Sequence, residues 1–327
     1  MRRLFHQGGW ILAALLSGPN ASSIAADNVL GLPSPDNPRR PGALVLHGGG
    51  KITDDVFARF VELAGGKEAR IVLVPCAGYR VGDYDSEGEF LSAMNRRFSA
   101  WVGLERAEQI RSFQFLYTDD PADADDKDFV DPMANATGVW FSGGFQGRLN
   151  YRFVGEYPKQ TRFQEALRAA VERGGVVGGT SAGTAALPEI MTMWDGADRT
   201  GGPLSVVAAH GFGLLRGAIM EQHFATRSGR LERFTGLLRD DDQLNRLTGR
   251  EDAGANMVGL GVEEQTALVL RGDRLETIGN GGAHVFLKSH DNRVISWHEL
   301  RSGESADIHR DPRGDITLRR LEIASKR

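Results

Sequence analysis

The chain has 327 residues, of which 41% are hydrophobic and 25% are charged, and its formal net charge is −4. This composition is typical of a globular protein that builds a sizeable core in one large domain or two small ones. The slight acidic excess gives no electrostatic support for nucleic-acid binding. The sequence has one cysteine, Cys76, which excludes an internal disulfide and is interpreted as a small packing residue.

The first 42 residues are predicted to lie outside the folded domain. Residues 1–3 carry positive charge, residues 10–18 form a short apolar run, and residues 23–26 offer a small-x-small cleavage site. The apolar run is too short to span a membrane and is typical of a signal peptide over residues 1–26, the alternative being an uncleaved tail. A Pro-rich linker over 27–42 and a single domain over 43–327 are expected to follow. We therefore expect an exported protein, periplasmic or extracellular.

From Ala43 onward, continuous apolar runs alternate with segments of helical spacing. The predicted strand regions, several of which end in glycines, are 43–50, 69–78, 112–118, 138–144 and the run from 176 up to a serine at 181. The predicted helical regions are 54–66, 87–104 and 162–175. Strands without polar alternation, separated by helices, predict an α/β fold with a mostly parallel sheet covered by helices on both faces.

The pattern changes in the C-terminal third, where short β-like pieces replace the alternation. These pieces are 268–270, 275–279, 283–288 and 293–297. We expect them to form an antiparallel extension of the same sheet. No internal repeat is present, so one α/β domain is the simplest interpretation.

A serine lies at a tight bend within the motif G-x-S-x-G, spelled by Gly179 to Gly183. A strand is predicted before the motif and a small-residue helix after it, which is the context of a nucleophile elbow that holds Ser181 in a strained conformation. The amide of Ala182 would begin that helix and could hold a developing oxyanion. The alternatives are a packing turn or a phosphate cradle. A P-loop is excluded because no Gly-Lys-Ser/Thr follows.

A nucleophilic serine requires a base, and the base requires a group that orients it. Among eight histidines, His223 lies where an apolar strand gives way to an Arg-rich helical stretch, and such strand ends gather functional sites in α/β sheets. His210 and His284 also remain as candidates. Glu263 and Glu264 open an apolar strand, where a carboxylate is costly unless it is paired. Strand alternation predicts that one of the two faces inward, without deciding which.

Four segments in this order give the sequence its resemblance to a known family. They are 141–149, 178–187, 221–234 and 259–270. With them the sequence resembles peptidase family S51, which includes cyanophycinase and aspartyl dipeptidase, over most of the chain from Ala43 to about Leu287. The resemblance implies a flavodoxin-like fold close to the class I glutamine amidotransferases, usually in a homodimer.

The resemblance also implies roles for individual residues. It makes Ser181 the nucleophile, His223 the general base and then acid, and Glu264 the group that orients His223, with Gly144 and Ala182 as oxyanion amides. The residues that it places at the substrate, or that occupy the matching positions, are Gln146, Glu221, Gln222, Arg227 and Arg230.

The sequence departs from the family pattern at two of these positions. Phe145 stands where the family commonly has Asp in Gly-Gly-Asp-Gln, and Glu221 replaces the Asp before Gln-His. The resemblance implies hydrolysis of cyanophycin, a poly-aspartate chain with arginine on each side-chain carboxyl, to β-Asp-Arg dipeptides through an acyl-enzyme. For this substrate, Glu221 is expected to meet a guanidinium, and Arg227 or Arg230 a carboxylate, in bidentate geometry.

Three other functions stay open at this point. The first is an exported dipeptidase of the same family that acts on Asp-X or isoaspartyl peptides. The second is an α/β-hydrolase-type esterase, which would need an acid such as Asp240 followed by His284 or His290. The third is a catalytically inactive binding protein. No spacing typical of metal ligands and no dinucleotide fingerprint occurs, so we expect no metal and no cofactor, and the glycine turn at 47–50 either contacts substrate or closes the first strand.

Overall fold

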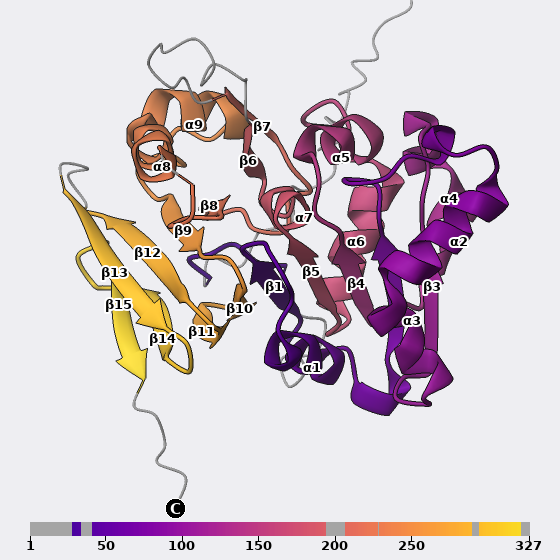
Figure 1. Ribbon diagram of the computed structural model, residues 1–327. Helices are drawn as coiled ribbons and strands as arrows, with labels where there is room; N and C mark the ends of the chain where they lie inside the picture. Colours follow the sequence, from indigo (N-terminus) through magenta and orange to yellow (C-terminus); the bar gives the residue numbers. More distant parts are fainter. Residues whose placement is uncertain (1–27, 34–40, 194–206, 228, 290–293, 322–327) are drawn as a thin grey trace, which may run out of the picture.

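Figure 1 shows a computed structural model of the chain, which describes residues 28–33, 41–193, 207–227, 229–289 and 294–321. The predicted signal peptide lies outside the described residues. A nine-stranded sheet crosses the molecule in the order β15-β14-β11-β10-β1-β5-β4-β2-β3. Smaller sheets of four and two strands lie beside it.

The parallel half of the large sheet is built from the continuous apolar runs of the first part of the chain. Its neighbouring strands, all parallel, are β1 (Ala43–His47), β5 (Val176–Thr180), β4 (Gly138–Phe141), β2 (Arg70–Val74) and β3 (Ser112–Phe115). β1, β4 and most of β5 are buried, as expected of strands with helices on both faces. The carboxyl ends of β1, β4 and β5 therefore meet at one edge of the sheet.

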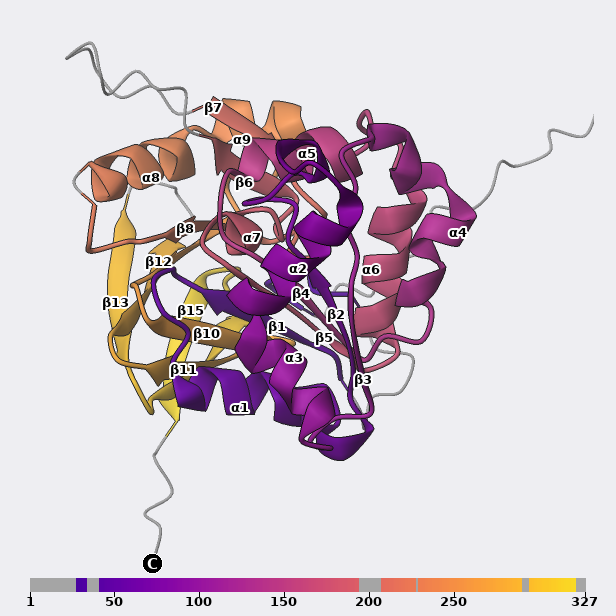
Figure 2. The same ribbon diagram turned by 45° about the vertical axis from the view of Figure 1, so that its right-hand side comes forward.

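Helices cover both faces of this half. On one face, Phe60 of α1 (Asp54–Leu63) packs edge-on against Trp140, with the ring centroids 4.9 Å apart, and Trp101 of α3 (Ser99–Arg106) packs beside them. Figure 2 shows α2 (Glu87–Arg97) and α3 in front of the central strands, with α1 below them in this view. The opposite face is covered by α6 (Arg162–Glu172), which buries Phe163, Leu167, Ala170 and Val171 as its spacing predicts. The helix expected over 87–104 is divided at Phe98, so that it forms α2 and α3.

Shorter elements link these layers. They are η1 (Gly66–Glu68), η2 (Val81–Asp83), η3 (Pro121–Asp125), α4 (Lys127–Val130), η4 (Asp131–Met133), α5 (Gln146–Phe153), α7 (Ala182–Ala185), β6 (Ile190–Met193) and β7 (Val207–His210). β6 and β7 pair with each other in an antiparallel ribbon. Of these elements, α5 and α7 begin at the carboxyl ends of β4 and β5.

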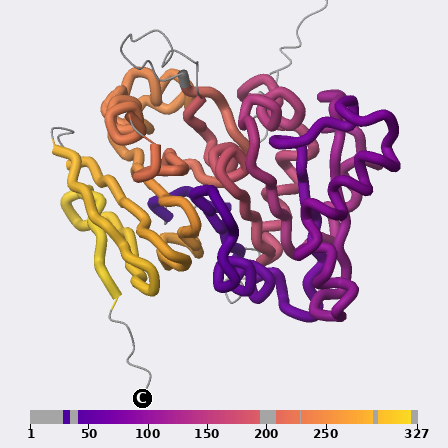
Figure 3. Tube along the Cα trace, viewed as in Figure 1, coloured from indigo at the N-terminus to yellow at the C-terminus, as the bar shows by residue number. Residues whose placement is uncertain are grey.

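The C-terminal strands do not all extend the large sheet, contrary to the sequence prediction. The strands that do extend it, antiparallel, are β10 (Thr266–Arg271), β11 (Arg274–Gly279), β14 (Ser305–Arg310) and β15 (Ile316–Leu321). The runs predicted at 283–288 and 293–297 instead form most of β12 (Gly282–Lys288) and part of β13 (Ile295–Arg301) in the second sheet, with β9 (Val258–Val262) and β8 (Ala218–Gln222). Figure 3 traces the returning chain, in which β10 lies beside β1.

A separate core explains why these strands leave the large sheet. Phe286 of β12 packs against Phe224 and against Phe234 of α8 (Arg230–Arg239), with ring centroids 5.7 and 5.6 Å apart. The helix α9 (Asp241–Thr248) adds Leu244 to the same cluster. The second sheet therefore gains its own helical cover, which hydrophobic runs of this length cannot reveal by pattern alone.

The folded unit also begins earlier than expected. Residues 28–33, which the sequence assigned to the linker over 27–42, pack against the domain. Leu30 and Leu32 are buried in the main core, and the backbone amides of Val29 and Leu30 each donate to Asp273 over 2.9 Å. The two leucines lie among prolines and polar residues, so the local pattern indicated a linker while their burial depends on strands far along the chain.

Candidate active site

Ser181 occupies the bend between β5 and α7. Its φ of 54° and ψ of −113° place it in a region that non-glycine residues seldom adopt, as at a nucleophile elbow. The bend is held because the Ser181 amide donates to the carbonyl of His47 over 3.0 Å. The hydroxyl of Thr184 donates to the same carbonyl over 2.8 Å. The serine is thus tied to the end of the neighbouring strand β1.

The glycines on either side of the bend are required by close backbone contacts. A Cβ on Gly179 would lie 2.5 Å from the carbonyl carbon of Gly183. A Cβ on Gly183 would lie 2.5 Å from the carbonyl oxygen of Phe141. The motif G-x-S-x-G is therefore a packing requirement at this site as well as a signature.

The structure brings His223 to Ser181. His223 follows the end of β8 with a φ of 52°, and its Nε2 lies 2.7 Å from Ser181 Oγ. Its amide donates to the carbonyl of Gly48 over 2.8 Å. A Cβ on Gly49 would lie 2.2 Å from the imidazole Cε1. The glycine turn at 47–50 therefore gives the imidazole a close backbone support, a role that the sequence left open between substrate contact and strand closure.

Glu263 and Glu264 point to different histidines. Both lie in the turn between β9 and β10, outside either strand, so strand alternation does not govern them. The Oε1 of Glu264 lies 2.5 Å from His223 Nδ1, whereas the Oε1 of Glu263 lies 3.0 Å from His284 Nε2. The carboxylate that completes a chain of hydrogen bonds from Ser181 is thus that of Glu264.

Burial favours the neutral form of the His223 imidazole. Desolvation lowers the pKa of His223 below its ordinary value, and the positive charges of Arg227 and Arg230 lower it further. The hydrogen bond and the charge of Glu264 act in the opposite direction without cancelling this effect. A neutral imidazole with Nδ1–H donated to Glu264 leaves Nε2 able to accept the hydroxyl proton of Ser181.

Two backbone amides beside Ser181 are available to bind a negative charge. The amides of Gly144 and Ala182 donate to no protein atom within the described part of the chain. Gly144 has a φ of 150°, and a Cβ there would lie 2.2 Å from the carbonyl oxygen of Ala77. A Cβ on Gly143 would lie 3.5 Å from Ser181 Cβ, so this turn passes close to the serine. Such amides suit an oxyanion.

The two glutamines predicted at the substrate differ in their contacts. Gln222 is buried, and its Oε1 lies 3.3 Å from Ser181 Oγ. Gln146 is also buried, but its Nε2 donates to the carbonyl of Thr192 over 3.0 Å. Gln222 is therefore at the serine, while Gln146 begins α5 and ties it to β6.

The charged residues predicted at the substrate do not share one environment. Glu221 is fully buried and forms ion pairs with Arg230 and, over 2.7 Å, with Arg233. Arg230 also donates to the carbonyl of Gln222 over 3.0 Å. Arg227 is exposed. This geometry directs Glu221 and Arg230 toward each other and leaves Arg227 facing solvent, so the prediction that Glu221 and Arg230 contact substrate finds no geometric support.

The histidines considered as alternatives bond to groups other than Ser181. His284 bonds to Glu263 and accepts from the indole N–H of Trp297 over 3.1 Å, and His210 lies 2.7 Å from the carbonyl of Leu247. The Asp240 carboxylate caps α9. The Ser-acid-His order of an esterase thus has no matching geometry through Asp240 and His284, and His290 lies outside the described residues.

The remaining findings concern the cysteine, metal-binding groups and membrane-spanning helices. Burial raises the pKa of the Cys76 thiol to about 12, which suits a packing residue. Among the residues that the structure describes, no group of three or more His, Cys, Asp and Glu side chains could hold a metal ion. Likewise, no described helix combines the length and apolarity needed to cross a membrane.

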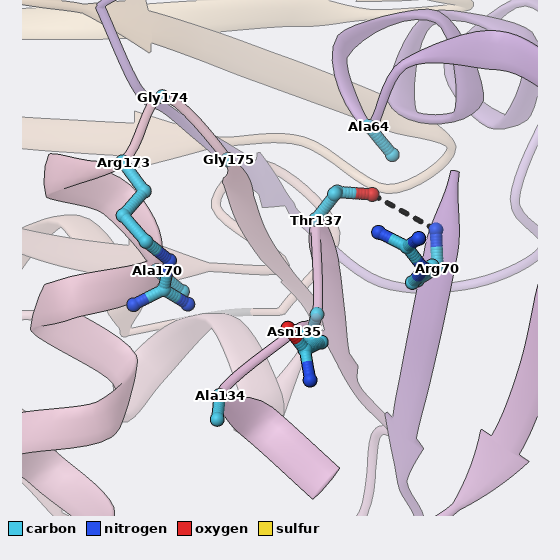
Figure 4. Close-up of a pocket in the computed structure, with 10 residues that line it drawn as sticks. Ala64, Arg70, Ala134, Asn135, Thr137, Ala170, Arg173, Gly174 and Gly175 are labelled. Carbon is cyan, nitrogen blue, oxygen red and sulfur yellow. Dashed lines mark hydrogen bonds between the residues drawn. The ribbon is translucent and has the colours of Figure 1, made fainter. Parts of the chain in front are cut away.

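A cavity of about 250 Å³ lies at the other edge of the sheet (Figure 4). It is lined by Arg70 at the start of β2, by Asn135 and Thr137 before β4, and by Arg173 after α6. The hydroxyl of Thr137 accepts from the amide of Arg70 over 2.9 Å. Because Ser181 follows the carboxyl end of β5, this cavity is separate from the serine site.

Comparisons with known proteins identify the family of this chain. The sequence model of peptidase family S51 matches residues 44–278. The chain is 28% identical to a cyanophycinase from Synechococcus elongatus, over 74% of this chain and 65% of the relative, and 25% identical to a cyanophycinase from Geminocystis herdmanii, over 74% and 77%. This chain thus spans just under two thirds of the length of the first of these relatives.

A solved structure shares the fold. The crystal structure of a peptidase from an acI-B1 Actinobacterium matches with a TM-score of 0.54 at 21% identity, covering 82% of this chain and 97% of that one. The predicted α/β class and the resemblance drawn from the four segments are both confirmed. By the extent of the family match, this chain belongs to peptidase family S51.

Proposed function

We propose that this chain is a serine peptidase that cleaves aspartyl peptides, with cyanophycin as its substrate, through Ser181, His223 and Glu264. The observation that carries the proposal is the pair of contacts at His223, with Nε2 2.7 Å from Ser181 Oγ and Nδ1 2.5 Å from Glu264 Oε1. Three groups from three separate turns meet in the order that acyl transfer requires.

The reaction follows from these contacts. Ser181 Oγ attacks the carbonyl carbon of the scissile amide while its proton passes to His223 Nε2. The negative charge on the carbonyl oxygen is held by the amides of Gly144 and Ala182. His223 then gives the proton to the leaving amine as the C–N bond breaks, which leaves an ester on Ser181. Water, deprotonated by His223, hydrolyses the ester, and the proton returns to Ser181.

The substrate class rests on the names of the relatives and on the charges near the serine. The relatives at 25–28% identity are cyanophycinases. Arg227 is exposed four residues after His223 and offers a guanidinium to a free carboxylate of an aspartyl chain. Gln222 supplies an amide at the serine itself. Both groups suit a polar peptide backbone that carries carboxylates.

A dipeptidase specificity within the same family is the second candidate, and Phe145 favours it. This side chain is 48% exposed at the start of α5, directly after Gly144, where the family commonly has an aspartate. Glu221, the carboxylate expected to meet an arginine of cyanophycin, is closed into ion pairs. A shorter Asp-X or isoaspartyl peptide needs neither an acidic group at position 145 nor a free Glu221.

One experiment separates the two candidates. Purified protein is incubated with insoluble cyanophycin granules and, in parallel, with soluble isoaspartyl dipeptides, and the products are identified by mass spectrometry. We expect β-Asp-Arg from the granules and none with Ser181→Ala. Intact granules alongside cleaved dipeptides would favour the dipeptidase. Cleavage of neither substrate, with rapid turnover of simple esters, would contradict a peptidase.

Export and dimerisation belong to the same proposal. The sequence of residues 1–26 supports a signal peptide, and the family resemblance supports a homodimer. Cell fractionation of the full chain, with N-terminal sequencing of the product, tests export. Sedimentation of the purified protein tests its association state.

A further inference from the structure

A second histidine–glutamate pair lies beside the one that contacts Ser181. His284 is buried in β12, with its Nε2 3.0 Å from Glu263 Oε1 and its Nδ1 3.1 Å from the indole Nε1 of Trp297. The other carboxylate oxygen of Glu263 accepts from the amide of Gly282 over 2.9 Å. This second pair extends from the rim of the second sheet to the turn that carries Glu264.

The hydrogen bonds fix the tautomer of His284. An indole N–H can only donate, so His284 Nδ1 must accept and cannot carry a proton. The proton of the neutral imidazole therefore lies on Nε2 and is donated to Glu263. Trp297 is itself held in place by stacking on Phe286, with ring centroids 5.5 Å apart at 21°. Trp297 therefore donates to His284, and His284 donates to Glu263.

Both residues of the contact between Glu264 and His223 are next to a residue that His284 touches. Glu263 and Glu264 are consecutive in one short turn, so the position of the first carboxylate constrains the backbone that carries the second. Phe224 directly follows His223, and its ring packs on the imidazole of His284 with centroids 4.9 Å apart. His284 therefore supports the turn that bears Glu264 and the residue next to His223.

We propose that His284 is a positioning residue, which holds Glu263 and Phe224 so that Glu264 stays at hydrogen-bond distance from His223. The inference rests on the proposed role of Ser181, His223 and Glu264, and assigns no contact with substrate to His284. A displacement of a reacting group by 1 Å can cost about 100-fold in rate, so loss of this support has a measurable effect.

The test uses two substitutions of similar size at position 284. His284→Gln keeps a side-chain N–H that can donate to Glu263, whereas His284→Leu fills space without donating. The rate of labelling of Ser181 by a fluorophosphonate is measured for the full chain, because it reports the serine and its base without reference to any peptide. We expect a fall of about 10- to 100-fold for His284→Leu and recovery of most of the rate for His284→Gln.

The controls separate a positioning role from a general structural one. His298→Leu makes the same change on the neighbouring strand β13, where the imidazole bonds to Ser296, and is expected to label at the wild-type rate. Glu263→Gln should slow labelling as His284→Leu does, because it replaces with an NH₂ group one of the two carboxylate oxygens that accept from Gly282 and from His284. With peptide substrate, the loss in the His284→Leu variant should fall on kcat, with KM little changed.

The outcomes distinguish the inference from the proposed function. A wild-type protein that is not labelled at Ser181 would overturn the proposed nucleophile. The positioning role alone would be overturned if the wild type is labelled and the folded His284→Leu and Glu263→Gln variants are labelled as fast as the wild type. Should His284→Leu not fold, Glu263→Gln and the ¹⁵N chemical shifts of His284 decide, since a proton found on Nδ1 would contradict the chain of hydrogen bonds.

Discussion

Two clusters at the end of β8 differ in whether their charged and polar groups are free to react or are already paired. His223 faces Ser181 and Glu264, and this cluster keeps a proton that can move between an oxygen and a nitrogen. Glu221, two residues earlier, is fully buried between two arginines, and both oxygens of its carboxylate are engaged. The first cluster is poised for reaction, whereas the charges of the second are already compensated.

The difference follows from where the chain places each side chain. Glu221 belongs to β8, which pairs with β9 on one side, and α8 covers its carboxylate with Arg230 and Arg233. His223 has left the strand and turned at positive φ, so that its ring faces the serine. Arg230 joins the clusters, because it bonds to Glu221 and to the carbonyl of Gln222. The compensated cluster therefore anchors the turn that carries the base.

The largest expected effect is the loss of the serine hydroxyl. Ser181→Ala removes the nucleophile, and kcat should fall by about 10⁶-fold, as expected when a member of a cooperating catalytic set is removed. Peptide hydrolysis followed by mass spectrometry measures it. The control is Ser112→Ala on the distant strand β3, which should keep the wild-type rate. A Ser181→Ala protein that cuts as fast as the wild type would remove the basis of the mechanism.

The two neighbouring glutamates should differ strongly in the same assay. Glu264→Gln presents an amide to His223 Nδ1, which favours the wrong tautomer and should lower kcat by about 10⁴-fold. Glu263→Gln leaves Glu264 in place and should cost only about 10- to 100-fold, through displacement of the turn. The ratio of the two rates is the measurement. Equal losses would show that the contact with His223 does not distinguish the two carboxylates.

Changes in the cluster of Glu221, Arg230 and Arg233 should lower the free energy of unfolding. Glu221→Gln leaves Arg230 and Arg233 buried without a counter-charge, and breaking such a pair costs about 3–5 kcal/mol of unfolding free energy. Glu62→Gln is the control, because Glu62 pairs with Arg59 at an exposed position and its loss should cost less than about 1 kcal/mol. Chemical denaturation measures both. A Glu221→Gln protein as stable as the Glu62→Gln protein would place Glu221 outside any stabilising role.

Much of this arrangement could be predicted from local sequence, and the limits have physical causes. Ser181 and the glycines around it predict the bend, because few residues tolerate the backbone conformation and close contacts found there. The local pattern could not choose between Glu263 and Glu264, since it assumed strand alternation and both residues lie in a turn, and only the family resemblance selected Glu264. The burial of Glu221 was missed for a related reason, because its partners lie on a helix whose packing direction the sequence does not state.

The same reasoning applies to the fold. The parallel strands are continuous apolar runs, which identify a sheet covered on both faces. The C-terminal strands are short, and a short apolar run fits either sheet, so their division between two sheets depends on the cluster around Phe234 and Phe286. Leu30 and Leu32 are buried by contacts that no neighbouring residue indicates.

Acid should weaken the fold through two histidines near the serine. Burial lowers the pKa of His47 to about 4, with a further contribution from the charge of His223, and the pKa of His223 is also lowered. The unfolded chain then binds protons more readily, so stability is complete above the ordinary pKa of 6.5 and falls as the pH drops below it. The slope reaches about 1.4 kcal/mol per pH unit for His47, and His223 adds to it in the same direction. Denaturation between pH 7 and 4 measures it, and His47→Leu should flatten the curve.

The smallest expected effect is that of Arg227, an exposed charge near His223. Arg227 lowers the pKa of His223, so Arg227→Gln should raise that pKa and move the acid limb of the fluorophosphonate labelling rate to higher pH. Because His223 must be neutral to accept the proton, the variant is slower on the acid side and equal to the wild type at alkaline pH. Salt screens an exposed charge, so the gap should close at about 1 M salt. Arg239→Gln, exposed at the far end of α8, is the control, and an equal shift in that variant would mean that net charge rather than position sets the pKa of the base.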